Sequence, residues 1–538
     1  MRPTLLLLIL LVQCVPTLQS PIPKIPTPNF VIFHIDDLGY GDLNSYGHPT
    51  THTPNIDDLY FDGGVKFAQA TTPDSVCTPN RVALLTGRYP IRTGFADNFY
   101  RVLYDSSTSS HIPFNVTTFG DVLKKKGYRT ALFGKWHAGL NIDSYNDSMA
   151  LPNSYGFDYY YGVPYGMNPY NDPNNPGPQA STLYENRELI QQPTYMYEFT
   201  NNMNNKILDR INDFSKEGLP FLLHINYLQV HTPMFASEEF QNKTLRGSYG
   251  DDLLEVDDSV GKIVTYIKSI GQDTDTVYFL LSDNGPYAEE GVDGGSHGLL
   301  KGNKGQTWEG GHRTPLIVRY KRYNDLYSTT KNKVYAGVVS SMDLFPTMIR
   351  IVNDVKEITT DHQNKKYRPT LNEPILFDGR EIDLKDIYLS TPTTKRNLTY
   401  STHRTLFYYC GQRVLAVRNG SYKTHFYTQS WSKPDVQACG YVDGREYGVC
   451  GCTDLDITKH DPPLVYNLDK DPGELHLLTQ LNFDQYEEVI NRAIDSLNVH
   501  VKNVVTVENQ MNKLPKPSLE PCCDYPKCCC NHHTCNTM

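Results

Sequence analysis

Four short apolar runs, each followed by polar residues of the kind used in catalysis, constrain the fold of this chain most strongly. The runs cover residues 30–35, 130–134, 221–227 and 277–282. Nearly continuous apolar runs of this length are typical of strands that are buried on both faces of a sheet. Helical patterns lie between them, for example in 253–264, where apolar residues recur at spacings of three and four. Strands that alternate with helices predict an α/β fold.

The polar side chains that follow these runs are expected to form one site. The carboxyl ends of neighbouring parallel strands meet at one edge of a sheet, and α/β proteins bind their ligands there. Asp36 and Asp37 come directly after a buried strand, which favours a functional site over a solvated turn. The acidic pairs at 57–58 and 257–258 fit an exposed helix surface instead. The residues predicted to meet at the sheet edge are Asp36, Asp37, Lys135, His137, His231, Asp283 and Asn284.

A lone cysteine, Cys77, lies at the start of a predicted helix. Thr78 is a suitable N-cap, Pro79 suits the first helical position, and Gly87 suits the C-terminal end. The amide groups and the dipole at a helix N-terminus favour an anion. Arg81, one turn further on, can direct its planar guanidinium group at the same anion. This segment therefore predicts an anion-binding site that contains the cysteine.

A short apolar run at the N-terminus, Leu5–Val12, predicts no spanning membrane segment, because a membrane-spanning helix needs roughly 20 apolar residues. Arg2 precedes this run, and small and polar residues follow it up to Ser20, so residues 1–20 are predicted to be a secretory signal peptide. The alternative is a buried N-terminal helix, which the prolines that follow disfavour. The predicted location is the secretory pathway, with the lysosome and the extracellular space both open. The N-glycosylation sequons agree with this route: Asn115, Asn146, Asn242, Asn397 and Asn419.

The cysteines fall into groups that suit an oxidising compartment. Of the twelve, four lie within 410–452 and six within 522–535, so each group can close as disulfides in an undetermined pairing. The second group contains two histidines as well, so metal binding by the tail stays open. Cys14 leaves with the predicted signal peptide, and Cys77 is left over. An unpaired cysteine in a secreted protein requires a functional explanation.

The charge of the chain excludes one class of partner. The formal net charge is −10, and no long basic run is present. Binding to nucleic acid as a polyanion is therefore disfavoured, whereas acidic residues can hold a metal ion.

Several blocks of the sequence, in the same order, resemble the type I sulfatases. The most specific is Cys-Thr-Pro-Asn-Arg at 77–81, followed by Leu-Thr-Gly-Arg at 85–88. Together the blocks span most of the chain, and no functional position is substituted. The others are Asp36-Asp37 with 39–42, Gly-Lys-Trp-His at 134–137, His-Thr-Pro at 231–233, Ser-Asp-Asn-Gly at 282–285, the lysine loop at 302–315, and two blocks at 416–426 and 463–474 that resemble the arylsulfatase C-terminal domain.

The resemblance implies an alkaline phosphatase-like fold. A large mixed sheet flanked by helices is expected, with a smaller C-terminal domain built on an antiparallel sheet. The expected boundaries are a catalytic α/β domain at 27–385, a C-terminal α+β subdomain at 386–510 and a cysteine-rich tail at 511–538. The branch that it resembles is that of the arylsulfatases and steroid sulfatases. No oligomeric state is predicted.

The resemblance also implies the reaction, which is the hydrolysis of aryl, sugar or steroid sulfate esters. The substrate would be a sulfated small molecule or glycan. By resemblance, Cys77 would be oxidised to Cα-formylglycine by a formylglycine-generating enzyme, and one hydroxyl of the hydrated aldehyde would attack sulfur. His137 would then deprotonate the second hydroxyl, which expels sulfate, while His231, with Lys135, would protonate the departing oxygen as a general acid.

Cations and one metal ion complete the implied site. Arg81, Lys135 and Lys304 would offset the charge of the sulfuryl group, with Lys304 favoured over Lys301 by its spacing to the Trp-Glu-Gly-Gly block at 308–311. Hard oxygen ligands suit Ca²⁺ or Mg²⁺, and by resemblance the ion is a single Ca²⁺ that touches both the nucleophile and a sulfate oxygen. Its implied ligands are Asp36, Asp37, Cys77 in its modified form, Asp283 and Asn284.

Two other functions stay open. A phosphodiesterase of the same superfamily would use an unmodified nucleophile, and such sites commonly hold two metals. A secreted binding protein without catalysis would use the cysteine-rich tail as its binding module and keep Cys77 in a disulfide. Formylglycine at position 77 would distinguish the sulfatase from both.

Overall fold

A computed structural model describes residues 26–521 with several gaps. The gaps are 100, 104, 167–170, 173–174, 177–180, 329, 331, 360–375, 391–403, 430–440, 443–444, 447–449, 479–482 and 506. The predicted signal peptide, the sequon at Asn397 and the cysteines from 522 onward lie outside the described residues. Within them, no helix combines the length and the apolar character needed to cross a membrane.

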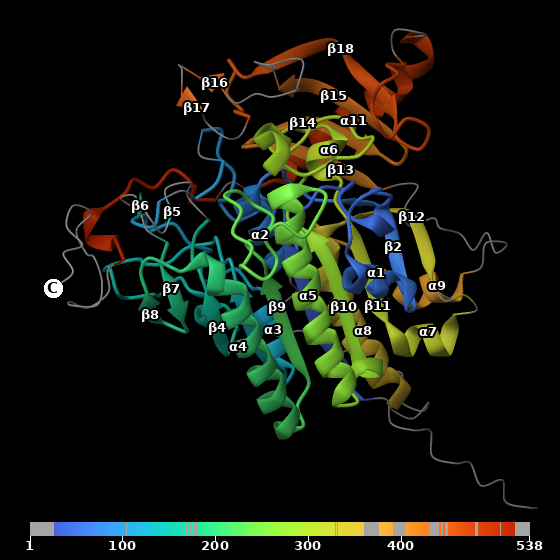
Figure 1. Ribbon diagram of the computed structural model, residues 1–538. Coiled ribbons are helices and arrows are strands. Elements are labelled where there is room, and N and C mark those ends of the chain that lie inside the picture. Colours follow the sequence, from blue (N-terminus) through green and yellow to red (C-terminus); the bar gives the residue numbers. More distant parts are fainter. Residues whose placement is uncertain are drawn as a thin grey trace, which may run out of the picture.

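A mixed sheet of ten strands forms the centre of the molecule (Figure 1). The four apolar runs form β1, β3, β9 and β10, which lie side by side and parallel in the order β10-β1-β9-β3. β11 is antiparallel to both of its neighbours, which makes the sheet mixed, as expected. The full order is β12-β2-β11-β10-β1-β9-β3-β4-β7-β8. The strands are β1 (Asn29–Ile35), β2 (Gly64–Thr71), β3 (Arg129–Gly134), β4 (Tyr159–Gly162), β7 (Leu183–Glu185), β8 (Glu188–Gln191), β9 (Phe221–Asn226), β10 (Thr276–Ser282), β11 (Leu316–Tyr320) and β12 (Lys333–Ser340).

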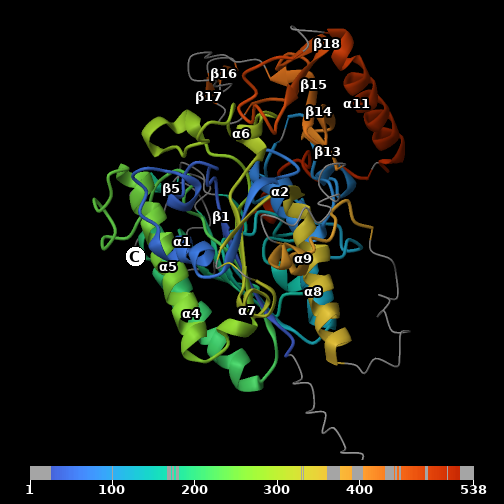
Figure 2. The same cartoon turned by 90° about the vertical axis from the view of Figure 1, so that its right-hand side faces the viewer.

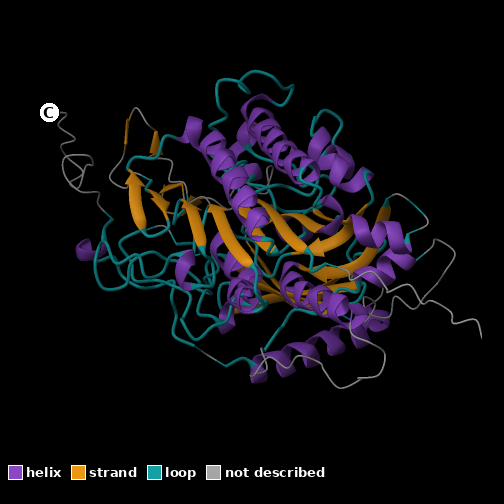
Figure 3. Ribbon diagram, turned by 90° about the horizontal axis from the view of Figure 1, so that it is seen from below, coloured by secondary structure: helices purple, strands orange, loops and turns teal. Residues whose placement is uncertain are grey.

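Helices cover both faces of this sheet (Figures 2 and 3). Successive side chains of a strand point to opposite faces, so Phe30 and Ile32 pack into one core while Val31 and Phe33 pack into the other. All four are fully buried, which explains why the run shows no polar alternation. One face carries α1 (Pro54–Phe61), α4 (Met196–Glu217) and α5 (Gly247–Ser269), and the other carries α2 (Cys77–Thr86), α3 (Phe119–Lys125) and α8 (Leu344–Thr359). Further short helices in the described ranges are α6 (Glu309–His312), α7 (Lys321–Tyr327) and α9 (Leu384–Leu389).

A separate antiparallel sheet lies beyond one end of the large sheet (Figure 1). Its strands are β13 (Thr405–Cys410), β14 (Arg413–Asn419), β15 (Tyr422–Gln429) and β18 (Ile457–Asn467), and α11 (Phe483–Asn503) packs on it. The predicted small C-terminal sheet is therefore confirmed. A disulfide joins Cys410 to Cys452, which is one of the pairings open to the first group of cysteines. Two pairs of two-residue strands also occur, β5 (Asn171–Asp172) with β6 (Asn175–Pro176) and β16 (Tyr441–Val442) with β17 (Arg445–Glu446).

The prediction that both acidic pairs lie on an exposed helix surface is wrong for one residue of each pair. Asp57 and Asp257 are buried, with 6% and 1% of their surface exposed. Asp257 Oδ1 accepts a hydrogen bond of 2.8 Å from the backbone N–H of Ile56, in the first turn of α1, and Asp57 Oδ1 accepts one of 2.9 Å from the backbone N–H of Ser45. The Asp257 carboxylate therefore satisfies a backbone donor where α1 packs on α5, and the Asp57 carboxylate satisfies a buried donor in the segment before α1.

Candidate active site

The carboxyl ends of the four central strands bring the predicted site residues together. Asp36 and Asp37 follow β1, Asp283 and Asn284 follow β10, Lys135 and His137 follow β3, and His231 lies five residues after β9. The helix α2 brings Cys77 and Arg81 to the same edge, and Lys304 reaches it from the loop before α6. The parallel arrangement of β10, β1, β9 and β3 is thus the reason that residues 247 positions apart, such as Asp37 and Asn284, meet.

Cys77 is the first residue of α2, so the prediction that it lies at a helix start is correct. Val76 precedes it with an extended backbone, and Gly87 ends the helix with a φ of 67°. The prediction that Thr78 caps the helix is wrong, because its hydroxyl accepts a hydrogen bond of 3.1 Å from the backbone N–H of Leu103. Cys77 is a free cysteine and is 2% exposed. Burial raises the pKa of its thiol, so the thiol is protonated at neutral pH.

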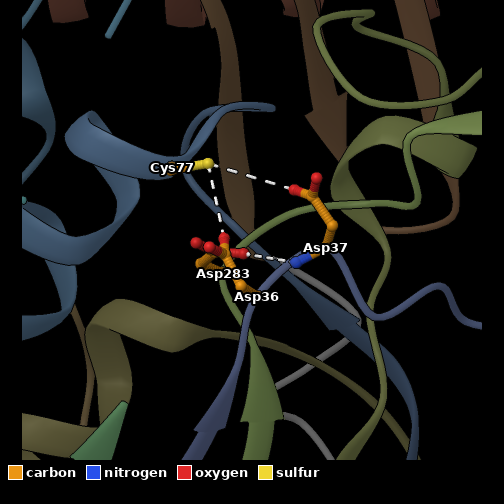
Figure 4. Close-up of side chains that lie close together, drawn as sticks. All are labelled: Asp36, Asp37, Cys77 and Asp283. Carbon is orange, nitrogen blue, oxygen red and sulfur yellow. Dashed lines mark hydrogen bonds between the residues drawn. The ribbon is translucent and has the colours of Figure 1, made fainter. Parts of the chain in front are cut away.

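Three carboxylates face this thiol (Figure 4). Cys77 Sγ lies 3.5 Å from Asp36 Oδ1 and 3.9 Å from Asp37 Oδ1, and the backbone N–H of Asp37 donates a 3.1 Å hydrogen bond to Asp283 Oδ1. One ligand atom from each of these four residues lies within 4.8 Å of all the others. Asp37 has a left-handed φ of 58°, which breaks the alternation of the strand and lets two consecutive carboxylates face the same point.

Three buried cations pair with the carboxylates. Arg81 Nη2 lies 2.7 Å from Asp283 Oδ2 and 3.2 Å from Asp36 Oδ1. Lys135 pairs with Asp36, and Lys304 Nζ lies 2.7 Å from Asp37 Oδ2. Burial opposes ionisation, but Lys135 and Arg81 hold the pKa of Asp36 well below its usual value. By contrast, the Lys301 ammonium lies 3.7 Å from the centre of the Trp308 ring, so it is Lys304 that reaches the cluster.

The donor set fits a hard divalent cation. Burial and the charge of Asp36 raise the pKa of Asp283 to about 7, which is the signature of carboxylates crowded together. Asn284 Nδ2 donates a 2.7 Å hydrogen bond to Asp37 Oδ1. Its Oδ1 is buried and has no hydrogen-bond partner in the described part of the chain. Carboxylate oxygens together with an unpartnered amide oxygen are the ligands that Ca²⁺ and Mg²⁺ prefer.

The two histidines are held in defined tautomers by backbone carbonyls. His137 Nε2 donates a 2.9 Å hydrogen bond to the carbonyl of Leu103, which leaves Nδ1 as a buried acceptor without a partner among the described residues. His231 Nδ1 donates to the carbonyl of Thr232, and its Nε2 lies 3.7 Å from Asp37 Oδ2. Burial, followed by the charge of Lys304, lowers the pKa of His231 to about 4, and burial lowers that of His137 well below its usual value.

Comparison with known proteins identifies the family. Residues 28–354 match the sulfatase family, and residues 401–530 match the C-terminal region of aryl-sulfatase. This chain belongs to the sulfatase family. It is 32% identical to the arylsulfatase of Hemicentrotus pulcherrimus, over 96% of this chain and 88% of the relative, and 30% identical to the steryl-sulfatase of Rattus norvegicus, over 92% and 93%. The chain is therefore a sulfuric ester hydrolase of the arylsulfatase and steryl-sulfatase branch.

The fold of this sulfatase agrees with that assignment. A solved sulfatase, PsFucS1 from Pseudoalteromonas sp., superimposes with a TM-score of 0.71, covering 90% of this chain and 92% of that one at 24% identity. The expected alkaline phosphatase-like architecture is thus confirmed by a family member. At this identity, the likeness shows the fold and leaves the substrate to other arguments.

The structure adds residues to the sulfatase site that sequence reasoning missed. The Lys304 ammonium lies 4.8 Å from the centre of the Tyr287 ring, and the centres of the Tyr287 and His231 rings are 6.4 Å apart. A Cβ atom added to Gly166 would lie 3.2 Å from His137 Cε1, so this glycine borders the imidazole. Tyr287 lies only four residues after Asp283, and this position could have indicated that it belongs to the site. Nothing in the sequence around Gly166 indicates its place beside His137.

Proposed function

We propose that this sulfatase hydrolyses its esters through a formylglycine formed from Cys77, with one bound Ca²⁺. The observation that carries the proposal is the placement of Cys77, a free and buried cysteine whose Sγ lies 3.5 Å from Asp36 Oδ1. An unmodified thiol is a poor nucleophile here, because burial raises its pKa. Oxidation to an aldehyde, followed by hydration, supplies hydroxyl groups at the same point.

The ligands of the cation would be Asp36, Asp37, Asp283, Asn284 and the modified side chain at position 77. When bound, a divalent cation supplies positive charge to the nucleophile and to a sulfate oxygen. The carboxylates are already paired with cationic side chains, which hold them in place before a metal or a substrate enters. This preorganisation supports binding without large rearrangement.

Arg81, Lys135 and Lys304 would stabilise the charge on the sulfuryl group. Each is buried, with at most 3% of its side chain exposed, so little water screens it. Preorganised cations in a water-excluded site usually provide the largest part of catalysis.

The histidines would move the protons. His137 Nδ1 is the free acceptor, because its Nε2–H is held by the carbonyl of Leu103, so it suits a base that takes a proton from the hydrated side chain at position 77. His231 Nε2 faces Asp37, and the charge of Lys304 also acts on this imidazole. An anionic ester bound beside it would favour the protonated imidazole, which could then donate to the leaving oxygen.

Two reagents test the aldehyde directly. A hydrazide, which condenses with aldehydes, should inactivate the enzyme towards nitrophenyl sulfate, while iodoacetamide, which alkylates thiols, should leave the activity unchanged. Loss of activity with iodoacetamide and not with hydrazide would contradict the proposal, because it would make the thiol the reactive group.

The role of His231 depends on the leaving group. We expect His231→Ala to slow the hydrolysis of an alkyl or sugar sulfate by about 10²–10⁴-fold, because a poor leaving group needs a proton on its oxygen. Hydrolysis of nitrophenyl sulfate should fall much less, since nitrophenolate leaves without one. The kcat values for both substrates give the comparison. An equal loss for both would indicate a role in binding or folding, with Lys135 as the next candidate for the acid.

The natural substrate is proposed to be a sulfated small molecule or glycan. The names of two relatives, an arylsulfatase at 32% identity and a steryl-sulfatase at 30%, support this class of substrate. A formylglycine-generating enzyme would act on the chain during biosynthesis in the secretory pathway, and the lysosome and the extracellular space remain the proposed destinations.

Passage through this pathway should leave glycans at the exposed sequons of the described residues. Asn115, Asn146 and Asn242 are exposed, whereas the Nδ2 atom of Asn419 is buried within β14. We expect enzymatic deglycosylation and peptide mass mapping of the secreted protein to find glycans at the first three sites and none at Asn419. A glycan at Asn419, with the exposed sites empty, would contradict this expectation.

A further inference from the structure

We propose that the small C-terminal sheet positions Lys304, with Gln429 as the central positioning residue. The inference rests on the proposed role of Lys304 in binding sulfate, and it assigns to the second sheet a part in the reaction. The first part of the lysine loop, residues 302–309, leads into α6, which lies beneath β14 and β15 in Figure 1. Contacts from β15 hold this loop on the C-terminal side of Lys304.

The first anchor is the peptide directly after Lys304. Gly305 has a φ of 85°, which only glycine adopts readily, and its N–H donates a 2.8 Å hydrogen bond to the carbonyl of Ser75, two residues before Cys77. The carbonyl of Gly305 accepts a 3.0 Å hydrogen bond from Gln429 Nε2 and a longer one of 3.4 Å from Arg101 Nη1. The loop is thereby tied both to the nucleophile segment and to β15.

The same glutamine also holds the next turn of the loop. Gln429 Oε1 accepts hydrogen bonds from the backbone N–H of Thr307, at 3.2 Å, and from its hydroxyl, at 3.1 Å. One buried amide group therefore donates to residue 305, and to Cys410 Sγ at 3.2 Å, and accepts from residue 307. A side chain that lacks either function cannot make both contacts.

A fully buried charge cluster forms the second anchor, at Glu309. Its Oε1 lies 3.0 Å from Lys423 Nζ on β15 and accepts a 2.9 Å hydrogen bond from the hydroxyl of Tyr408 on β13. The backbone N–H of Glu309 donates a 2.7 Å hydrogen bond to Glu474 Oε2, and Lys423 Nζ lies 3.3 Å from Glu474 Oε1. The charged side chains of Glu309, Lys423 and Glu474 are all 0% exposed. Because the local dielectric constant is low, their mutual attraction is strong, and removing one of them would leave a buried charge unpaired.

These anchors matter because a lysine side chain has a long flexible stem. Lys304 Nζ reaches Asp37, the Lys304 side chain is 3% exposed, and the backbone N–H of Lys304 donates a 2.9 Å hydrogen bond to the carbonyl of Pro286. A shift of the backbone at 305–309 would move this charge relative to sulfate. Misplacement of a catalytic group by about 1 Å can cost about 100-fold in rate.

The test replaces the glutamine and compares it with its neighbour. Gln429→Leu should lower kcat/KM for nitrophenyl sulfate by about 10- to 100-fold and weaken inhibition by inorganic sulfate. Thr428→Val is the matched control, because Thr428 is the preceding residue of β15 and its hydroxyl bonds His460 Nε2 at 2.9 Å, away from the loop. The control should show neither change, while thermal unfolding reports on the stability of both variants.

A double-mutant cycle separates positioning from general stability. In a Lys304→Ala background, Gln429→Leu should cause no further loss of kcat/KM, because the residue that it positions is gone. If Gln429→Leu proves unable to fold, Thr307→Val removes one hydrogen bond only and should lower kcat/KM by about 2- to 10-fold, again without effect when Lys304 is alanine.

Two results would overturn the inference. One is a folded Gln429→Leu or Thr307→Val enzyme with unchanged kcat/KM and sulfate inhibition, and the other is a loss of the same size with and without Lys304. Either result would leave the proposed function intact, since the parent enzyme would still be active. A parent chain that carries formylglycine and Ca²⁺ but lacks turnover would instead reject the proposed function itself.

Discussion

Replacing Cys77 by alanine should abolish the sulfatase activity without unfolding the protein. The substitution removes one buried sulfur atom that lies 3.5 Å from Asp36 Oδ1 and makes no disulfide, so the expected loss of stability is about 1 kcal/mol. The activity is lost because position 77 then has no group that can be oxidised and hydrated. Turnover of nitrophenyl sulfate and thermal unfolding of the same preparation give the two readouts.

Cys77→Ser is the sharper control for the mechanism. A serine hydroxyl can accept sulfate but lacks the second hydroxyl that expels it, so this variant should be nearly as inactive as Cys77→Ala. A single turnover that then stops would agree with the account. Substantial steady-state activity in either folded variant would contradict covalent catalysis through residue 77.

Replacing Asp283 by alanine should lower kcat by at least about 100-fold, for activated and poor leaving groups alike. This carboxylate accepts a 3.1 Å hydrogen bond from the backbone N–H of Asp37 and lies 2.7 Å from Arg81 Nη2. Its removal therefore leaves both groups without this partner and also removes one proposed metal ligand. Asp258→Ala provides the matched control, because Asp258 is 36% exposed and pairs with Lys262 one helical turn away. We expect that control to retain the activity of the parent enzyme.

Metal analysis of the same proteins tests whether Asp283→Ala loses activity because it no longer binds the cation. The parent enzyme should contain one Ca²⁺ per chain, Asp283→Ala should contain little, and a chelator should inactivate the parent until Ca²⁺ is returned. Two tightly bound transition metals per chain would instead favour the phosphodiesterase alternative.

The sequence predicted the central part of the fold because that part has a strong local signal. Runs such as Phe30–Ile35 are apolar throughout, since both faces of β1 are covered, and the polar residues after each run mark the strand ends. The matching blocks predicted which residues should share a site, and the parallel order of β10, β1, β9 and β3 explains why they meet.

Other features depend on contacts between distant segments and left no such signal. Thr78 has a residue type and a position that suit a helix cap, but its hydroxyl accepts a hydrogen bond from the backbone N–H of Leu103. The sequence pattern places Asp257 on a helix surface, and only the packing of α1 against α5 buries its carboxylate. Gln429 lies 122 residues from Thr307, on a strand whose side-chain pattern does not reveal its role at the lysine loop. Such contacts arise from packing, which residue periodicity does not encode.

The most direct measurement of the central claim is mass spectrometry of the peptide that contains residue 77, taken from preparations that differ in activity. The account predicts an aldehyde at this position, and a specific activity that rises in proportion to the fraction of chains that carry it. Fully active enzyme with an unmodified thiol at position 77 would contradict the account.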